Sequence, residues 1–367
     1  MSFWNKTIAN LDDHFFGLDI SDFSLKAIEI KKNGSRDKIK SFSLINFKEK
    51  LVDSGKIVNK EGLVNVLKGL KNQKKHRIKT NKVVCSLPEE KSFLRLIQIP
   101  FIKEQDKIKE AVKWELEANI PLSINDVIFD FYVLPQEFQL KKNQLSILVL
   151  AVNKEIVNDL LEVLDKTGLD PIGMESESFA LVRSLLGEND KNKVSLIMDI
   201  GGNKTSFLFV VNELLLFTSS IYISAKTFTD NIAKDFNMNF REAEKLKIEQ
   251  GIGSMTKRDP IFVSLEGSLN SLAEEARRSI DFFIEKLQYA NRLDQIILCG
   301  GGAGMKGLIP YLAKKLGYPT FLGNPWKNVR LGKIIPPMNR EESVEYATAI
   351  GLALKKIDEE KLFDEFL

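Results

Sequence analysis

The sequence predicts an α/β protein built from two similar lobes, and three observations support this prediction. A strand-turn-strand unit occurs twice, because Asp19 and Asp199 each end an apolar strand and precede an isoleucine and a short polar turn. Asp199 follows Asp19 by 180 positions, close to half of the 367-residue chain. Helical and strand patterns follow each unit in alternation, as they do in α/β domains. An internal duplication therefore explains the sequence better than one continuous domain.

Composition places the chain among ordinary soluble globular proteins. Hydrophobic residues make up 44% of the sequence and charged residues 28%, and the formal net charge is +3. The basic run at residues 71–79 is read as a solvated helix end rather than a nucleic-acid patch. The longest apolar run, residues 147–152, is far shorter than the ~18 residues of a membrane span. Residues 1–10 show no signal-peptide pattern.

The cysteines and histidines limit the kinds of chemistry that the chain supports. Cys85 and Cys299 each lie in or at the end of an apolar stretch, which predicts buried, reduced thiols. His14 and His76 are the two histidines in the sequence, and neither belongs to a motif. Zinc sites and hydrolytic triads that need histidine are therefore poorly supported.

The expected elements follow in chain order. Periodicity predicts a helix over 104–121, with apolar residues at Ile108, Val112, Leu116 and Ile120. A further helix is expected to end at Gly168. The other predicted strands are 83–87, 127–134, 145–152 and the two hairpins at 15–30 and 196–212; the other predicted helices are 239–251, 272–288 and the one that follows the strand and glycine turn of 295–317.

Two glycine-rich turns are the candidate binding elements. The familiar phosphate-binding loops lead from a strand into a helix. After Gly201 and Gly202, however, the chain continues as a strand, so this turn belongs to a hairpin. The run Gly300–Ala303 precedes a helix, and its glycines either admit a ligand to the backbone or permit a tight turn.

Five motifs, taken in order, resemble the actin/Hsp70/sugar-kinase superfamily. Residues 17–26 and 198–206 resemble its two phosphate motifs and residues 298–308 its adenosine motif, while 177–186 and 345–354 resemble the two helices that connect its lobes. The resemblance implies a duplicated, two-lobed actin-like (ribonuclease H-like) ATPase fold. It also implies that Glu244 and Lys247, three apart on one helix face, hold the ribose of ATP.

Within that superfamily the sequence resembles the PilM family of type IV pilus assembly proteins. The resemblance covers about residues 16–354 and rests on five stretches: 17–30, 112–134, 178–186, 276–287 and 322–329. It implies an FtsA-like inserted module over 88–166. The first lobe is then expected to comprise 1–87, 167–190 and about 335–367, and the second lobe 191–334.

The resemblance implies that ATP is bound with Mg²⁺, and the residues permit a physical reading of that site. Carboxylates near phosphates need a cation between them, so Asp19 and Asp199 are read as Mg²⁺ partners through water, the alternative being turn caps. Glu177 either orients a water molecule as a catalytic residue or caps a helix. The expected cofactor-binding residues are Asp19, Ser21, Lys26, Asp199, Gly201, Gly202, Asn203, Thr205, Glu244, Lys247, Gly300, Gly301, Gly302 and Ala303.

The first phosphate turn departs from the family pattern. Relatives usually carry glycine after the Asp-Ile pair, whereas this chain has Ser21 and Asp22. A side chain at Ser21 narrows access and Asp22 adds negative charge, so weaker nucleotide binding or a tilted turn is expected. Lys26 compensates if it faces the site, although a strand lysine more often faces solvent.

The resemblance implies a cytoplasmic, ATP-binding scaffold of the pilus inner-membrane assembly complex. It is expected to capture the N-terminal peptide of PilN in a groove between the first lobe and the inserted module, to reach the membrane through partners and to hydrolyse ATP slowly at most. An FtsA-like filament-forming ATPase and a small-molecule kinase are the alternatives. A kinase needs an acceptor-site aspartate cluster that the sequence lacks, and the acidic residues of the amphipathic tail 358–367 disfavour an FtsA-like membrane anchor.

Overall fold

The computed structural model describes residues 14–31, 38–70, 77–120, 122–256, 258–329 and 339–355. Most of the basic run at 71–79, His76 and the acidic tail lie outside the described residues. The chain forms two compact units, which are considered separately: the first comprises Met1–Arg183, Val329–Pro336 and Thr348–Leu367, and the second Ser184–Asn328 and Pro337–Ala347. No helix among the described residues is long and apolar enough to cross a membrane.

The first unit is built on a mixed five-stranded sheet in the order β10-β6-β1-β2-β3. Strands β1, β2 and β3 are antiparallel to one another, and β6 and β10 continue the sheet in parallel with β1. The strands are β1 (Phe16–Ile20), β2 (Ser24–Lys31), β3 (Lys38–Asn46), β6 (Lys82–Leu87) and β10 (Asp170–Ser176), with a small hairpin of β4 (Val52–Asp53) and β5 (Lys56–Ile57). The helices are α1 (Lys60–Leu70), α3 (Lys154–Thr167), α4 (Glu177–Leu185), α10 (Ala347–Ala353) and the short η2 (Glu89–Lys91).

The second unit repeats this topology in the sheet β13-β12-β11-β14-β15. Its first three strands form an antiparallel meander and its last two run parallel to β11, as in the first sheet. The strands are β11 (Val194–Ile200), β12 (Thr205–Val211), β13 (Leu214–Ile221), β14 (Gln295–Cys299) and β15 (Thr320–Leu322). The helices are α5 (Ala225–Asp235), α6 (Phe240–Glu249), α7 (Pro260–Phe282), η6 (Phe283–Leu287), α8 (Leu308–Leu316), α9 (Arg340–Ser343), η5 (Glu188–Asp190) and η7 (Val344–Tyr346). The predicted duplication is confirmed, since both sheets share one strand order.

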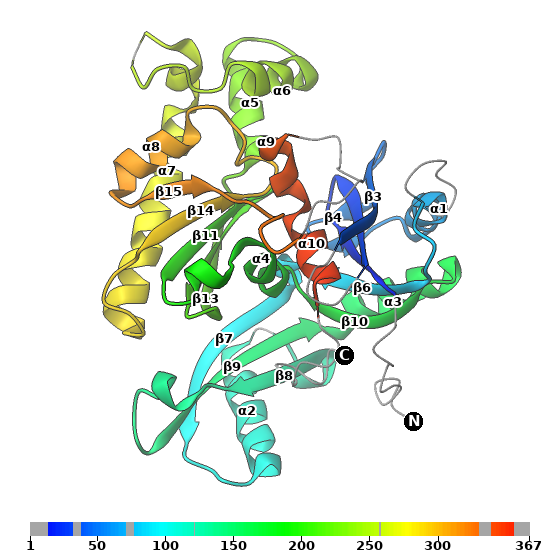
Figure 1. Cartoon of the computed structure of the whole chain (residues 1–367), viewed down its shortest axis with the longest axis vertical. Helices are drawn as coiled ribbons and strands as arrows, with labels where there is room; N and C mark the ends of the chain where they lie inside the picture. Colours follow the sequence, from blue (N-terminus) through cyan, green and yellow to red (C-terminus); the bar gives the residue numbers. More distant parts are fainter. Residues whose placement is uncertain are drawn as a thin grey trace. The chain divides into compact units, whose positions relative to one another are not determined.

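A third, three-stranded sheet forms the core of the inserted module, in the order β7-β9-β8 with α2 against one face (Figure 1). Its elements are β7 (Ser92–Pro100), α2 (Gln105–Asn119), η3 (Ile124–Asp126), β8 (Val127–Val133), η4 (Gln136–Phe138) and β9 (Gln144–Asn153). The four apolar residues predicted for one face of α2 are all buried in this core. Helix α3, which the sequence analysis placed in the module, packs on α1 and also contacts β5, β9 and β10. The module's own core therefore ends with β9.

Helix ends follow the capping signals in the sequence. Asn153 caps the first turn of α3 through the amide of Glu155, and Gly168 ends the helix with a φ of 66°. That conformation is left-handed and costs glycine nothing, so the predicted helix end at Gly168 is confirmed. At α6, Asn239 and Glu242 form a reciprocal capping box.

Around β1, the elements of the first unit pack so closely that their backbones meet. A Cβ at Gly17 of β1 would overlap the carbonyl oxygen of Ala349 in α10, and a Cβ at Gly351 would overlap that of Ala180 in α4. Leu352 joins Ala180 in the small apolar cluster at this crossing. Helix α10 is therefore fixed closely against β1, and α4 closely against α10.

Candidate functional site

The first candidate turn, between β1 and β2, is closed by its own serines. The amide of Ser21 donates to the carbonyl oxygen of Ser24 at 2.9 Å, and the hydroxyl of Ser21 donates to the same oxygen at 3.0 Å. The two hydroxyl oxygens lie 3.2 Å apart. The Ser21 side chain thus contacts the other end of its own turn.

Asp22, which the sequence analysis treated as added negative charge in this turn, caps a neighbouring hairpin. Its two carboxylate oxygens accept hydrogen bonds from the amides of Ser54 and Gly55, each at 3.0 Å. Both of these residues have positive φ, at 48° and 75°. The two amides offset part of the charge that Asp22 brings to the turn.

Asp19 lies buried beside a cation from the next strand. Asp19 and Lys26 are cross-strand partners, and the Lys26 Nζ atom lies 3.9 Å from Asp19 Oδ2. Lys26 Nζ also donates to the Ser24 hydroxyl at 3.0 Å, and the Ser86 hydroxyl donates to Asp19 Oδ1 at 3.1 Å. Burial raises the pKa of Asp19 above its ordinary value, while Lys26 and Ser86 act in the opposite direction. Lys26 is buried, so it does not face solvent as strand lysines usually do.

The second candidate turn, between β11 and β12, is held by the start of α5. The carbonyl oxygen of Gly201 accepts from the amide of Ala225 at 3.0 Å, and that of Gly202 from the amide of Lys226 at 3.3 Å. The amide of Gly201 donates across the turn to the carbonyl of Lys204 at 2.9 Å. In the described part of the chain, the amide of Gly202 makes none of the turn's backbone hydrogen bonds. A backbone amide that is not used within its own turn can donate to an anion.

Two further residues of the hairpin have different surroundings. Asn203, in the turn itself, is partly exposed. Thr205, expected to donate its hydroxyl to a phosphate, is fully buried and donates to the carbonyl of Ile223 at 2.7 Å. A buried hydroxyl with a good acceptor gains nothing by turning away from it, so Thr205 holds β12 to the segment that leads into α5.

Asp199 and the glycines 300–302 form one packed group at the end of β11. The Asp199 Oδ1 atom lies where a Cβ on Gly300 would be, and Gly300 has a φ of 81°. The Cys299 thiol donates to the same oxygen at 3.7 Å. The amide of Gly302 donates to the carbonyl of Ile200 at 2.9 Å, and a Cβ there would lie 2.5 Å from the Ile200 side chain. The need for a tight turn therefore explains the glycines at 300 and 302.

The remaining residues of this loop leave one open position. Gly301 is exposed, and a Cβ there would lie 3.7 Å from the nearest atom, Glu345 Oε1. Ala303 is buried, and its amide donates to the carbonyl of Gly300 at 3.1 Å. Gly301 is thus the glycine of the three with room beside its backbone.

Glu244 and Lys247 form the predicted pair on α6. The Lys247 Nζ atom lies 2.7 Å from Glu244 Oε2 and also donates to the Thr229 hydroxyl at 2.8 Å and to the Ala225 carbonyl at 3.0 Å. The Thr229 hydroxyl donates to Glu244 as well. Burial lowers the pKa of Lys247. Lys247 therefore fastens α6 to α5, while Glu244 stays partly exposed.

Glu177 opens α4 directly after β10 and is half-buried. Its neighbours Ser176 and Ser178 donate their hydroxyls to one oxygen of Glu89, at 2.7 and 2.6 Å. These bonds join the start of the inserted module, at η2, to the junction of β10 and α4. A carboxylate in the first turn of a helix is also favoured by the helix dipole, so the cap reading of Glu177 remains open.

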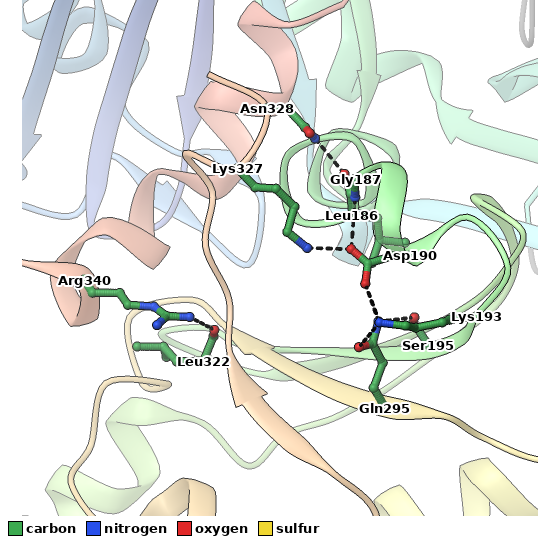
Figure 2. A network of polar contacts seen from close by, with 10 residues as sticks. All are labelled: Leu186, Gly187, Asp190, Lys193, Ser195, Gln295, Leu322, Lys327, Asn328 and Arg340. Atoms are coloured by element: carbon green, nitrogen blue, oxygen red, sulfur yellow. Dashed lines mark hydrogen bonds and ion pairs between the residues drawn. The ribbon is translucent and has the colours of Figure 1, made fainter. Parts of the chain in front are cut away.

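A polar network that the sequence analysis did not identify surrounds the buried Asp190 (Figure 2). Its carboxylate accepts from Lys327 at 2.5 Å, from Gln295 at 3.0 Å, from Lys193 at 3.1 Å and from the amide of Gly187 at 3.1 Å. Four donors hold the pKa of Asp190 well below its ordinary value even though burial opposes this. The network ties the chain that enters the second unit to the chain that leaves it at Lys327. An aspartate beside a lysine-containing turn is common in sequences and gave no recognisable signal.

Comparison with known proteins identifies the family. Residues 17–357 match the family of the type IV pilus assembly protein PilM. The chain belongs to the PilM family. A solved PilM-PilN type IV pilus biogenesis complex is 28% identical to this chain, with a TM-score of 0.80, and covers 94% of this chain and 98% of the other.

More distant relatives share the fold. The cell division protein FtsA of Buchnera aphidicola is 20% identical over 344 residues, which are 82% of this chain and 81% of the relative. The solved MreB5 of Spiroplasma citri bound to ADP is 13% identical, with a TM-score of 0.54, and covers 92% of this chain and 94% of that one. The expected α/β actin-like ATPase fold is confirmed.

Proposed function

We propose that the protein is a nucleotide-binding scaffold of the type IV pilus assembly complex, and that it binds the N-terminal peptide of a PilN protein. The observation that carries the proposal is the similarity, over 94% of the chain, to a PilM-PilN complex. Membership of the PilM family assigns the chain to pilus assembly. The nucleotide, the peptide and a position at the inner face of the cytoplasmic membrane through partners are the proposed parts.

The second unit supports nucleotide binding through its backbone. The turn at Gly201 and Gly202 has its carbonyls held by α5, and the loop at Gly301 is open beside its backbone. The solved actin-like relative MreB5 binds ADP, and another structure of it binds AMPPNP. We assign the phosphates to the Gly202–Asn203 turn, the ribose to Glu244 and the adenosine to the loop at Gly301.

Asp199 suits Mg²⁺ better than Asp19 does. Asp199 is a partly exposed carboxylate, the kind of oxygen ligand that Mg²⁺ takes directly or through water. Asp19 is buried and already has the Lys26 ammonium 3.9 Å away. We therefore propose that Asp199 holds Mg²⁺, which would neutralise the phosphate charge, and that Lys26 supplies the positive charge beside Asp19.

A calorimetric titration with Mg-ATP tests the nucleotide proposal. Saturable binding is expected for the wild-type protein, at least ~tenfold weaker binding for Asp199→Ala and unchanged binding for Asp235→Ala, since Asp235 is an exposed aspartate of the same unit. An absence of binding at millimolar Mg-ATP would overturn the nucleotide part. Glu177→Gln, compared with the wild type in a phosphate-release assay, tests whether Glu177 orients the attacking water.

The peptide part of the proposal concerns the first lobe and the inserted module. Glu89 joins the two through Ser176 and Ser178, so the module's starting point is fixed against β10. We propose that the peptide binds between them. Fluorescence anisotropy with a labelled N-terminal PilN peptide should show saturable binding, and a scrambled peptide of the same composition should not bind. Equal binding of both peptides would contradict capture of PilN.

A further inference from the structure

One end of the inserted module combines exposed apolar side chains with lysines. At this end β7 finishes at Pro100 and β9 begins at Gln144, and the two residues are cross-strand partners. The next residue, Phe101, is 54% exposed and its amide donates to the carbonyl of Asn143 at 3.0 Å. Leu140, in the loop that joins β8 to β9, is 43% exposed. Figure 1 shows the end of β7 and this loop at the same end of the module.

Three exposed lysines surround these two side chains, namely Lys103, Lys141 and Lys142. Among the described residues no ion pair involves any of the three. The exposed acidic side chains at this end are Glu104, Asp106 and Glu137, and Glu104 lies 3.5 Å from a fourth exposed lysine, Lys107. Four exposed lysines and three exposed carboxylates therefore give this end of the module a small net positive charge beside the exposed apolar groups.

A shallow depression lies between the lysines and the strand ends. Its volume is about 420 Å³, and it is lined by Pro100, Lys141, Lys142, Asn143 and Gln144. Two ammonium groups at the rim of an open depression suit a small anionic group at a surface.

We propose that this end of the module, defined by Phe101, Lys103, Leu140, Lys141 and Lys142, docks on an anionic lipid bilayer. Phe101 and Leu140 enter the boundary between headgroups and acyl chains, and the three lysines contact anionic headgroups, one of which occupies the depression. Aromatic and apolar side chains flanked by lysines are the combination that binds this interface. Charge complementarity favours lipid over an apolar partner. The contact is direct and adds to any membrane recruitment through partners.

The expected binding is weak and reversible. A lysine close to an anionic membrane surface strengthens binding by about fivefold. Three lysines and two half-exposed apolar side chains fall well short of a membrane anchor. The contact would therefore orient a protein that is already near the membrane.

Vesicle co-sedimentation tests the proposal with the full chain and with a chain ending at Lys355, which removes the acidic tail. At low salt, both should bind vesicles of phosphatidylglycerol and phosphatidylcholine, and neither should bind phosphatidylcholine alone. Replacing the three lysines by glutamine should weaken binding by about a hundredfold, and Phe101→Ser with Leu140→Ser by roughly tenfold. Higher salt should release the protein because it screens the lysines.

Trp114→Ser is the matched control, because Trp114 is 73% exposed on α2 of the same module but lies among charges of both signs. Its binding should be unchanged. A Phe101→Trp variant supplies a second readout that does not depend on loss of binding, since the emission of the introduced indole should shift to shorter wavelength on anionic vesicles. Three results would each overturn the proposal. The protein could bind neutral and anionic vesicles equally, it could lose binding only when the tail is removed, or the bound Phe101→Trp variant could show no shift in emission. Retained anionic binding by the lysine variant would overturn it as well.

Discussion

The thiol of Cys299 lies 3.7 Å from Oδ1 of Asp199 and occupies, in the second unit, the position that Ser86 has against Asp19 in the first. Strand register explains the correspondence. Cys299 pairs directly with Asp199, and Ser86 follows the Leu18–Cys85 pair by one step. Each turn thus begins at an aspartate whose carboxylate accepts a hydrogen bond from the neighbouring parallel strand. The duplication extends from strand order to individual side-chain contacts.

We predict that neither cysteine reacts with thiol reagents in the folded protein. Burial raises the pKa of both thiols, and the charge of Asp199 raises that of Cys299 further, so the reactive thiolate is absent at about pH 8. Titration with a chromogenic disulfide should detect neither thiol natively and both in concentrated guanidinium chloride. Rapid native labelling would contradict the buried positions.

Replacing Gly300 by alanine should destabilise the protein more than the same change at Gly317. Both glycines have φ near 80°, so alanine costs about 1–2 kcal/mol at either one. At Gly317 nothing lies within 4 Å of the new Cβ, whereas at Gly300 it overlaps the Asp199 carboxylate and should cost about 1–3 kcal/mol more. Denaturant midpoints measure the difference. Equal losses would mean that Asp199 moves freely, and Mg-ATP titration of both variants would then show whether that movement matters.

The pair Asp19 and Lys26 should show strong coupling. Lys26→Met leaves a buried carboxylate without its cation and should cost about 3 kcal/mol near neutral pH. Adding Asp19→Asn removes the uncompensated charge and should restore at least ~1 kcal/mol, which a double-mutant cycle measures.

The pH dependence of this pair follows from the raised pKa of Asp19. The folded state holds the proton to higher pH than the unfolded state, so this group lowers stability as pH rises above its ordinary value of 3.8. The loss in Lys26→Met should therefore shrink on acidification to about pH 4. A loss that is independent of pH would exclude Asp19 as its cause.

Asp190→Asn should reduce stability by about 2–3 kcal/mol near neutral pH, because four donors lose a charged acceptor. The folded pKa is depressed, so the stabilisation is present above the unfolded value and is lost as pH falls through the folded value. The difference between wild type and variant should therefore begin to shrink below about pH 4 in thermal unfolding and should disappear only at much lower pH. Glu188→Gln is the control from the same turn: its exposed pair with Lys191 should contribute at most about 1 kcal/mol.

Lys247→Met should lower stability as well as nucleotide affinity. The ammonium is buried and donates to three acceptors, so its loss removes one donor from each of the Glu244, Thr229 and Ala225 oxygens, at a cost of about 2–3 kcal/mol. Lys245→Met, on the exposed face of the same helix, should be nearly neutral. Unchanged stability in Lys247→Met would assign the residue to the ligand alone.

Much of the fold could be predicted because it depends on local patterns. Hydrophobic periodicity located α2 and its buried face, Gly168 ended α3, and the repeated aspartate hairpins indicated the duplicated sheets. These signals act within a few residues of each other. The bounds of the module, which include α3, came from the family resemblance, and the packing of α3 on α1 is a tertiary contact that periodicity does not encode.

The site was less predictable because the roles of its side chains depend on distant partners. The position of Thr205 in the motif suggests that it binds a ligand, yet its hydroxyl donates to the carbonyl of Ile223. Asp22 suggested repulsion in the turn, yet two amides from a separate hairpin donate to its carboxylate. The buried orientation of Lys26 follows from its register opposite Asp19, which a single strand pattern does not reveal. Spacing located these residues, and only the fold shows their partners.

The glycines at 17 and 351 determine which substitutions this protein can tolerate. Between β1, α10 and α4 there is backbone on both sides and no room for even one methyl group. In a saturation library screened for folded protein, both positions should accept glycine alone, although neither needs an unusual φ. Gly69, where an added methyl group would have nothing within 4 Å, should accept most amino acids. Natural relatives should show the same difference. Glycine should be retained at positions 17 and 351, and position 69 on α1 should vary.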